Sequence, residues 1–315
     1  MKSTLLFRLG GLGDLMVVLP SIYLLRKIHR ASFLTLVCRE EYGRILKEAA
    51  VVDSIISISD PKIAPLFESP PYPEELAQWL RRFSFILGWM QKKSNLTLEE
   101  YFLSLKQKRC HFFIHDPDYR GPISTFFFEK TLEFLNGEKS STLPFSDCTL
   151  LPLSSHQKDE GVKLLGEEIL KKGDEIAVVH PGSGSESKCW PLDNFFKIIL
   201  KLSQRGFGGT LVTGMSETRI ENRLKSTNFP AGWVWLQNPP LIKLSGLLSR
   251  AAIYLGNDSG VTHLAAACGT DVVALFRKDL ESYWKPFGRV AVLSSESVYD
   301  IGLSSVWETI TSILR

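Results

Sequence analysis

An aspartate closes a glycine-rich turn near the start of the chain. The stretch RLGGLGD, residues 8–14, follows the apolar run STLLF and leads into an apolar, helix-like segment. Gly11 and Gly13 let another molecule approach the backbone closely. Asp14, an acid in a first helical turn, is stabilised by the helix dipole by about 0.3–1 kcal/mol. An exposed, ionised carboxylate there can take a proton from an incoming hydroxyl, worth about 10²–10⁴ in rate. Asp14 is therefore either a general base or a simple helix cap.

A loop in the second half has the composition of an anion site. In HPGSGSESKCWP, residues 180–191, a strand gives way to a Gly/Ser loop and a helix start. Such a loop exposes N–H groups to phosphate, while Lys188 adds a point charge and Ser183 a hydroxyl donor. The GxxxxGK[ST] pattern of a P-loop is absent. An ordinary strand-to-helix connection also fits these residues.

A second loop, GNDSGVTHLAAACG at residues 256–269, offers another helix N-terminus. Asp258, Ser259 and Gly260 precede or open that helix, whose first N–H groups can face a second phosphate. His263 either supports this loop or hydrogen-bonds a sugar or phosphate. No spacing of histidine and cysteine predicts a catalytic metal.

Glu217 opens a further helix just after Gly214, which ends a strand-like run. Acids at this kind of position can bind both hydroxyls of a ribose. Capping the helix, or simple solvation, explains Glu217 equally well.

The elements that position these residues alternate along the chain. Strand-like runs TLLFRL, SFLTLVC and DSIISIS enclose helix-like residues 14–29 and EEYGRILKEA, a βαβαβ order typical of a parallel, doubly wound sheet. A helix at residues 156–171 starts the order again, and helices separate the strands EIAVVH, GTLVTG, WVWL, AIYLGN and DVVALF. We therefore predict an α/β protein of two doubly wound Rossmann-like domains, residues 1–155 and 156–315, which face a central cleft.

Composition excludes several classes of protein. With 315 residues, 44% hydrophobic and 23% charged, the chain is long enough for two ordinary globular domains. A net charge of +3 is too small to favour nucleic acid as a partner. Five cysteines without a CxxC pair indicate reduced thiols in a cytoplasmic protein. The N-terminus does not fit a signal peptide, and no apolar run reaches the ~18 residues of a transmembrane helix.

Together these segments resemble the heptosyltransferase family of bacterial glycosyltransferases, glycosyltransferase family 9, which uses ADP-heptose to build lipopolysaccharide core. The matching pieces are R-x-G-x-L-GD with a following proline, HPG…K-x-WP and GNDSG-x-x-HLAAA-x-G, in the same order across nearly the whole chain. The resemblance implies a GT-B fold and an inverting transfer without metal or cofactor. It also implies a nucleotide-sugar donor on the C-terminal domain and a lipopolysaccharide core or related glycan as acceptor.

Carried over residue by residue, the resemblance makes Asp14 the general base. Lys188 matches the lysine that holds the donor's phosphate and ribose, and Glu217 matches the ribose-binding acid. The nucleotide base would lie against main chain near Pro239. The loop that binds the diphosphate and sugar matches Asp258, Ser259 and Gly260.

Two segments depart from the family pattern. FRKDLES replaces a glycine-containing turn after the last predicted strand, which brings Arg277 and Lys278 towards the cleft. Residues 60–135 match no pattern, so a lipid-linked or oligosaccharide acceptor is expected but not identified. Helices are predicted at residues 73–93 and in TLEEYFLSLKQK.

The helix predicted at 73–93 raises the question of a membrane. Leu76, Trp79 and Phe83 follow helical spacing, whereas Phe85 and Trp89 lie off that stripe and basic residues flank them. The helix either packs in the core or rests on an anionic inner leaflet as a peripheral contact.

Two other function classes stay open. A GT-B epimerase or hydrolase of sugar nucleotides would need no acceptor pocket and would act on the donor alone. A non-catalytic sugar-nucleotide-binding protein would be indifferent to the loss of Asp14.

Overall fold

The computed structural model describes residues 3–28, 32–67, 72–90, 101, 110–136, 149–166 and 175–315. The chain divides into two compact units, Met1–Pro144 and Phe145–Arg315. This division comes before the predicted boundary at residue 155. The N–H groups of Leu150 and Leu151 both donate to the carbonyl oxygen of Ala267 at 3.0 Å, and both side chains are buried. The segment before residue 155 therefore belongs to the second unit.

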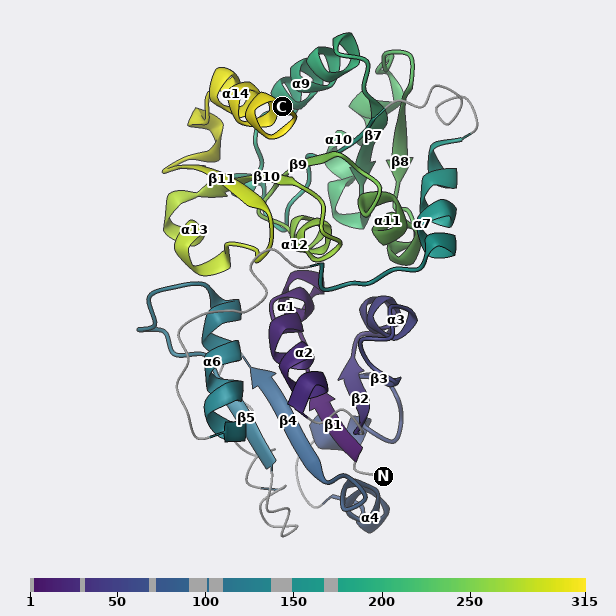
Figure 1. Ribbon diagram of the computed structural model, residues 1–315, viewed down its shortest axis with the longest axis vertical. Coiled ribbons are helices and arrows are strands. Elements are labelled where there is room, and N and C mark those ends of the chain that lie inside the picture. Colours follow the sequence, from purple (N-terminus) through teal and green to yellow (C-terminus); the bar gives the residue numbers. More distant parts are fainter. Residues whose placement is uncertain are drawn as a thin grey trace. The chain divides into compact units, whose positions relative to one another are not determined.

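The first unit contains a sheet of five parallel strands in the order β3-β2-β1-β4-β5 (Figure 1). The strands are β1 (Ser3–Phe7), β2 (Phe33–Cys38), β3 (Ser54–Ser57), β4 (Phe85–Met90) and β5 (Cys110–Ile114). The predicted βαβαβ order of the first three strands is confirmed. Apolar side chains from β1, β2, β4 and β5 form one buried cluster, which includes Leu5, Phe7, Val37, Ile86 and Phe112.

Helices connect these strands. They are α1 (Leu12–Met16), α2 (Leu19–Ile28), α3 (Glu40–Glu48), α4 (Glu74–Leu80) and α6 (Ile123–Asn136), with a 3₁₀ turn η1 (Ala64–Phe67). The single helix predicted at residues 14–29 is thus two helices, separated by a turn at Val17 and Val18. α2 and α6 pack against each other.

The helix predicted at residues 73–93 is wrong for residues 81–90, while residues 91–93 lie outside the described residues. Residues 85–90, FILGWM, form β4, which lies between β1 and β5 and is buried along its whole length. Phe85 and Trp89 therefore point into the unit, and the membrane-facing helix that they would complete does not exist. A strand buried on both faces reads as a continuous apolar run, which a helical period can imitate. TLEEYFLSLKQK, apart from Tyr101, lies outside the described residues.

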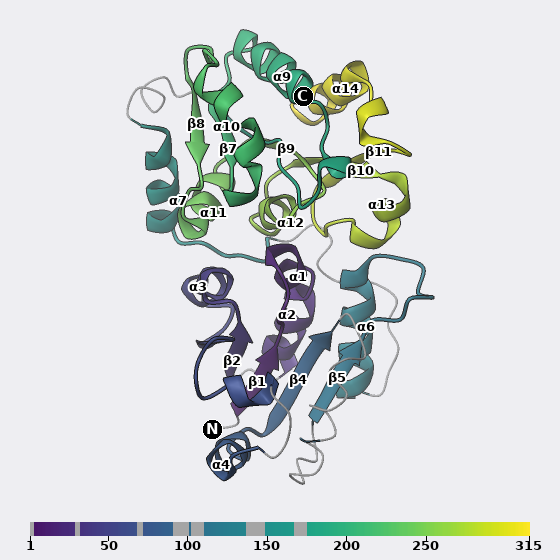
Figure 2. The ribbon, with the colours of Figure 1, turned by 180° about the vertical axis from the view of Figure 1, so that it is seen from behind.

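The second unit contains a sheet of six parallel strands in the order β11-β10-β9-β6-β7-β8 (Figure 2). They are β6 (Ile176–His180), β7 (Gly208–Thr213), β8 (Trp233–Gln237), β9 (Ile253–Asn257), β10 (Val272–Arg277) and β11 (Val290–Ser295). The first five were predicted. The edge strand β11, only partly buried, was not.

The helices of this unit include one that the sequence did not reveal, α13 (Lys278–Trp284), which begins within FRKDLES. The others are α7 (Ser155–Val162), α9 (Leu192–Gln204), α10 (Thr218–Lys225), α11 (Leu241–Leu248), α12 (Gly260–Ala267) and α14 (Leu303–Ile313). Four 3₁₀ turns are described here: η3 (Lys163–Leu165), η4 (Glu186–Lys188), η5 (Met215–Glu217) and η6 (Val298–Asp300). The described part of the helix predicted at 156–171 consists of α7 and η3.

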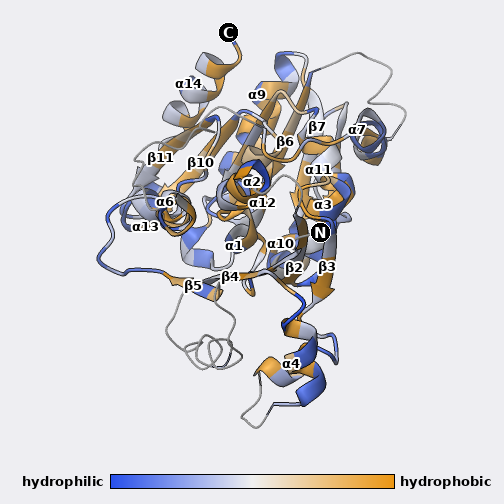
Figure 3. Ribbon diagram, turned by 60° about the horizontal axis from the view of Figure 1, so that its bottom comes forward, coloured by the Kyte–Doolittle hydropathy of each residue, from blue (hydrophilic) through white to orange (hydrophobic). Residues whose placement is uncertain are grey.

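The core of this unit lies between the sheet and the paired helices α9 and α14, which lie side by side in both views (Figures 1 and 2). Hydropathy colouring shows β6 and β10 as largely hydrophobic (Figure 3). Burial of this apolar surface is the main contribution to the stability of the folded unit. Because the strands are held in place by this core, so are their ends, which carry the polar loops. In the described parts of the chain, no helix is long and apolar enough to cross a membrane.

Candidate active site

Asp14 is held by a buried arginine to which the sequence analysis gave no role. Arg8, 2% exposed, follows β1, and its Nη2 donates to Asp14 Oδ1 at 2.8 Å. Its Nε donates to the main-chain oxygen of Asp14, and its Nη1 to the main-chain oxygen of Trp89, both at 2.7 Å. The guanidinium lies 5.3 Å from the centre of the Phe127 ring. Arg8 is the first residue of the RLGGLGD motif, and a charged residue directly after a buried strand is the signal that could have identified it.

The second carboxylate oxygen of Asp14 caps helix α1. Oδ2 accepts the N–H of Gly11 at 2.8 Å, and the main-chain oxygen of Gly13 accepts from Val17 at 3.0 Å. A Cβ on Gly10 would overlap the carboxylate, so a glycine is needed there. The Asp14 side chain is 20% exposed. It is therefore not the bare carboxylate expected, but a capping, ion-paired group that still reaches solvent.

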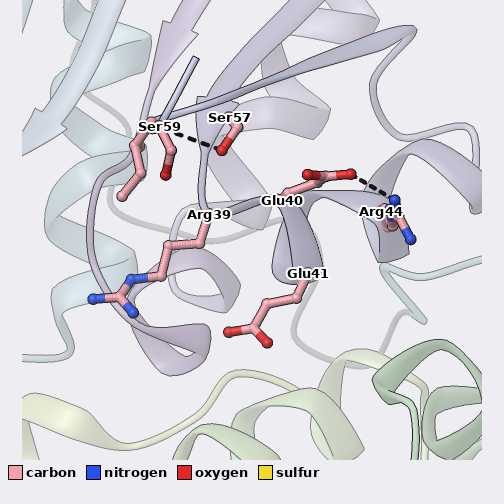
Figure 4. A pocket seen from close by; sticks show the side chains of 7 residues that line it. Arg39, Glu40, Glu41, Arg44, Ser57 and Ser59 are labelled. Atoms are coloured by element: carbon pink, nitrogen blue, oxygen red, sulfur yellow. Dashed lines mark hydrogen bonds and ion pairs between the residues drawn. The ribbon is translucent and has the colours of Figure 1, made fainter. Parts of the chain in front are cut away.

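A polar pocket of about 490 Å³ lies at the ends of β2 and β3, in the same unit (Figure 4). Figure 4 shows Arg39 and Glu41 extending to one side of it, while Arg44 pairs with Glu40 at 2.5 Å. Ser57, Ile58 and Ser59 complete the lining. Sequence reasoning did not single out this pocket, although charged residues directly after β2 were a usable signal.

Tyr42 connects this pocket with Asp14. Burial chiefly raises the pKa of Tyr42, and the carboxylates of Glu41 and, more weakly, Asp14 act in the same direction. Tyr42 therefore lies within electrostatic reach of both acids. β1 and β2 are neighbours, so Asp14 and the pocket share the carboxyl edge of one sheet.

In the second unit, the two predicted anion loops meet. Lys188 Nζ lies 2.8 Å from Asp258 Oδ2, and Ser183 Oγ donates to the main-chain oxygen of Asp258 at 2.6 Å. The Lys188 side chain is 29% exposed and that of Asp258 8%. Asp258 therefore orients an ammonium group that remains open to solvent.

Asn257, which was not predicted as a site residue, connects the same two loops through hydrogen bonds. Its Nδ2 donates to the main-chain oxygen of Pro181 at 2.7 Å, and its Oδ1 accepts from Trp190 N–H at 3.0 Å. The residue is fully buried. A buried amide whose oxygen and nitrogen both have hydrogen-bond partners fixes the loop geometry. Asn257, the asparagine of GNDSG, therefore has a structural role.

The start of α12 is capped as the sequence suggested. Ser259 Oγ accepts from Thr262 N–H at 3.3 Å, and Gly260 is the first helical residue. His263 is 2% exposed, and its ring meets that of Trp284 edge-on at 6.5 Å. The structure thus places His263 under the loop rather than on its surface.

Glu217 lies at the next strand end. Its Oε2 accepts from Gly214 N–H at 2.5 Å and lies 3.9 Å from His180 Nε2. Burial lowers the pKa of His180, although the charge of Glu217 opposes this. Glu217 lines a cavity of about 190 Å³ together with Gly182, Ser183, Cys189 and Tyr299, among others.

Pro239 lies farther along the same edge. The preceding residue, Asn238, has a φ of 46° and donates its N–H to Thr213 at 2.6 Å, so the end of β8 is tied to that of β7. At the end of β10, Arg277 binds Asp279 at 2.6 and 3.0 Å, and Lys278 lies 3.6 Å from Glu296. Both cations therefore have acidic partners within the unit.

One edge of the sheet in the second unit therefore carries five of the predicted donor-binding residues: Ser183, Lys188, Glu217, Asp258 and Ser259. Asp14 lies in the first unit. Among the described residues, no group of three or more His, Cys, Asp or Glu side chains is placed to hold a metal ion.

Comparisons with known proteins give the family and the fold of the chain. Lipopolysaccharide heptosyltransferase 3 of Escherichia coli K12 is 29% identical over 159 residues, which are 45% of this chain and 42% of that relative. The matching region thus spans less than half of the relative's length.

Solved structures show the fold. A glycosyl transferase family 9 protein from Veillonella parvula matches with a TM-score of 0.80 and 15% identity, covering 99% of this chain and 97% of that one. ADP-heptose lps heptosyltransferase II of E. coli matches with a TM-score of 0.77 and 15% identity, covering 100% and 98%. The two parallel α/β sheets are thus those of a GT-B protein. The model of the heptosyltransferase family matches residues 126–300, more than half of the sequence, and the chain belongs to glycosyltransferase family 9.

Proposed function

We propose that this protein is an inverting glycosyltransferase that moves a heptose from a nucleoside-diphosphate sugar, ADP-heptose, to a lipopolysaccharide core or related glycan. Family membership supports sugar transfer. The observation that carries the proposal is the gathering of Lys188, Ser259 and Glu217 at one sheet edge, with a solvent-reaching carboxylate, Asp14, in the other unit.

The donor would bind to the second unit. The ammonium of Lys188 and the first N–H groups of α12 would receive the diphosphate, because helix N-termini favour anions. Glu217 would accept hydrogen bonds from the ribose hydroxyls, and the base would lie near Pro239. Since Asp258 already binds Lys188 at 2.8 Å, the lysine must share its charge between this acid and the phosphate. Asp258 would therefore limit affinity while it fixes the position of the ammonium group.

The acceptor hydroxyl would lose its proton to Asp14. Arg8 and Gly11 each use one oxygen of this carboxylate, but each oxygen has a second lone pair that can accept a proton. The pocket of Arg39, Glu41 and Ser59 beside it offers the charged and hydroxyl groups that bind sugar hydroxyls. The acceptor, lipid-linked or an oligosaccharide, would dock there.

The leaving diphosphate would be stabilised by protein groups alone. Pre-oriented cations and N–H donors aimed at a developing charge can supply this stabilisation, so no metal or cofactor is proposed. EDTA should leave the transfer rate unchanged, and a strict requirement for magnesium would contradict this part of the scheme. Cys38 and Cys268 are buried free thiols, which suits the cytoplasmic location that we propose.

The decisive test is Asp14→Asn. We expect transfer to fall by about 10²–10⁴, while ADP still raises the melting temperature. A ligand at 100 times its dissociation constant adds about 2.7 kcal/mol of stability, which a thermal-shift assay detects. Equal loss of transfer and of ADP binding would reduce Asp14 to a helix cap. An incubation with donor alone distinguishes an epimerase or hydrolase, which would consume the donor without an acceptor.

A further inference from the structure

His180 lies between the two strand ends that carry the donor groups. It ends β6, which pairs with β9 on one side and β7 on the other, and it is 4% exposed. Its Nδ1 lies 3.3 Å from Ser259 Oγ, beyond β9. Its Nε2 lies 3.9 Å from Glu217 Oε2, beyond β7. One imidazole thus has a different donor-site residue at each nitrogen.

The surrounding hydrogen bonds are compatible with a bare Nδ1 on this ring. Thr262 Oγ1 lies 2.5 Å from the main-chain oxygen of Asn257, which can only accept, so the Thr262 hydroxyl donates there. Thr262 Oγ1 can in turn accept from Tyr254, 3.0 Å away, or from Ser259, 3.1 Å away. The Ser259 hydroxyl accepts from Thr262 N–H and can give its own proton either to Thr262 Oγ1 or to a bare Nδ1.

The Glu217 carboxylate, 3.9 Å from Nε2, favours the tautomer that carries its proton on Nε2. The other tautomer would set a nitrogen lone pair against that negative charge. Burial keeps the ring neutral at neutral pH, because it lowers the pKa of His180. The contact with Glu217 is therefore between a dipole and a charge, and it is not an ion pair.

Glu217 is confined from other directions as well. The same Oε2 accepts from Gly214 N–H, and a Cβ on Gly182 would overlap the carboxylate. The acid therefore lies against β6, the loop after β6 and the residue that follows β7. A change at His180 would alter the direction of the carboxylate without removing it.

We propose that His180 is a positioning residue, which fixes Ser259 and Glu217 relative to each other so that they receive the diphosphate and ribose ends of the donor. This inference rests on the proposed function. His180 does not touch the reacting atoms, so it acts on donor affinity through its two neighbours.

Three variants separate the two ends of the ring. His180→Asn keeps an acceptor near the place of Nδ1, His180→Gln keeps an amide N–H near the place of Nε2, and His180→Ala removes both. Titration calorimetry with ADP, and with UDP and GDP in parallel, should show an approximately threefold weaker affinity for Asn and Gln. It should show a weakening of about tenfold or more for Ala, since one hydrogen bond contributes about 0.5–1.5 kcal/mol.

Double-mutant cycles test the route of the effect. His180→Gln has already lost the contact with Ser259, so Ser259→Ala should weaken ADP binding less in the His180→Gln protein than in the wild type. His180→Asn has already lost the contact with Glu217, so Glu217→Gln should likewise weaken ADP binding less in the His180→Asn protein than in the wild type. The crossed pairs, His180→Asn with Ser259→Ala and His180→Gln with Glu217→Gln, should instead be close to additive.

Ile198→Val is the control for stability alone. Ile198 belongs to α9 and is fully buried in the core of the second unit, so this variant should lower the melting temperature and leave ADP affinity unchanged. His180 variants that behave like Ile198→Val, less stable but with wild-type affinity, would overturn the inference. If the wild-type protein binds none of the three nucleotides, the proposed function itself fails.

Discussion

Arg8 explains how a carboxylate in a first helical turn can be both fixed and chemically available. Its planar guanidinium supplies three hydrogen bonds in set directions, to Asp14 Oδ1, to Asp14 main chain and to Trp89 main chain. A compact ammonium cannot reproduce this fork. The charge of Arg8 is buried, so its pairing with Asp14 also removes a cost that an isolated cation would impose.

We predict that Arg8→Lys lowers the turnover number strongly and leaves the affinity for ADP unchanged, because only the direction of Asp14 is lost. The main-chain oxygens of Trp89, which is buried, and of Asp14, which is partly buried, would lose their donors, which should cost about 1–3 kcal/mol of unfolding free energy. Steady-state kinetics and urea unfolding measure the two effects. Arg250→Lys, at an arginine paired with Asp159 and half exposed, is the control and should change stability by less than about 1 kcal/mol. Unchanged turnover in Arg8→Lys would show that Asp14 needs no such clamp.

Two histidines, His180, which is buried, and His115, which is half-buried, predict the pH dependence of stability. Burial lowers the pKa of His180 and of His115, at the end of β5, below the ordinary 6.5. The unfolded chain therefore binds protons at a higher pH than the folded one, and stability rises with pH in this window. The contribution of these histidines to the free energy of unfolding should be complete above about pH 6.5. It should fall as the pH drops towards their pKa values in the folded protein.

Urea unfolding at several pH values between 5 and 8 measures this slope. His180→Gln should flatten the part that belongs to the second unit, and His115→Gln the part that belongs to the first. His156→Gln, at an exposed histidine in α7, should leave the slope as it is. If His180→Gln and His115→Gln both keep the wild-type dependence of unfolding free energy on pH, other groups must cause the acid sensitivity.

Periodicity predicted most elements of the second unit, because its strands are short apolar runs bounded by glycine or polar turns. Periodicity failed where the same run of apolar residues fits both a helix and a strand. In FILGWM, an apolar run long enough for a strand directly follows the helical stripe of α4, and only pairing with β1 and β5 decides its conformation. β11 is an edge strand with little burial, so its sequence carries a weak signal.

The contact between α7 and α11 is another feature that the sequence did not show. A Cβ on Gly161 would meet the backbone of Lys243, Gly246 and Leu247, and one on Gly246 would meet the backbone of Gln157. The two helices therefore cross backbone against backbone, and neither glycine can gain a methyl group without moving a helix.

We predict that Gly246→Ala lowers the free energy of unfolding by about 1–3 kcal/mol, the usual cost of overpacking, even though alanine favours helices. Thermal or urea unfolding measures the change. His156→Ala, on the exposed side of α7, should stay within about 0.5 kcal/mol of wild type. A more stable Gly246→Ala would show that propensity outweighs the crossing.

Across the whole chain, the loops of the site could be predicted from their motifs, and most of their partners could not. Lys188 and Asp258 are 70 positions apart and Arg8 and Trp89 are 81 apart, and nothing in one segment specifies the other. Strand order creates these contacts, because β6, β7 and β9 become neighbours only in the sheet. The acceptor side was less predictable, since residues 60–135 carry no motif and part of them lies outside the described residues.

Each unit has its own sheet and its own buried cluster, which leads to a prediction about the division of the reaction. A protein of residues 145–315 should fold and bind ADP with nearly the affinity of the full chain, because Ser183, Lys188, Glu217, Asp258 and Ser259 all lie within it. Residues 1–144 should not bind ADP, and neither piece alone should transfer sugar, since Asp14 and the donor groups are separated.

Titration calorimetry with ADP on each of the two pieces tests this prediction. The matched control is Lys188→Gln in the 145–315 piece. It should bind ADP about tenfold more weakly or worse, because a hydrogen bond to a charged group is lost. The starting point matters, because Leu150 and Leu151 bind Ala267 at the end of α12, so a piece that starts at residue 156 should be less stable. A folded 145–315 piece without affinity for ADP would mean that the first unit supplies part of the nucleotide site. The assignment of the donor to one unit would then be wrong, although the family would stand.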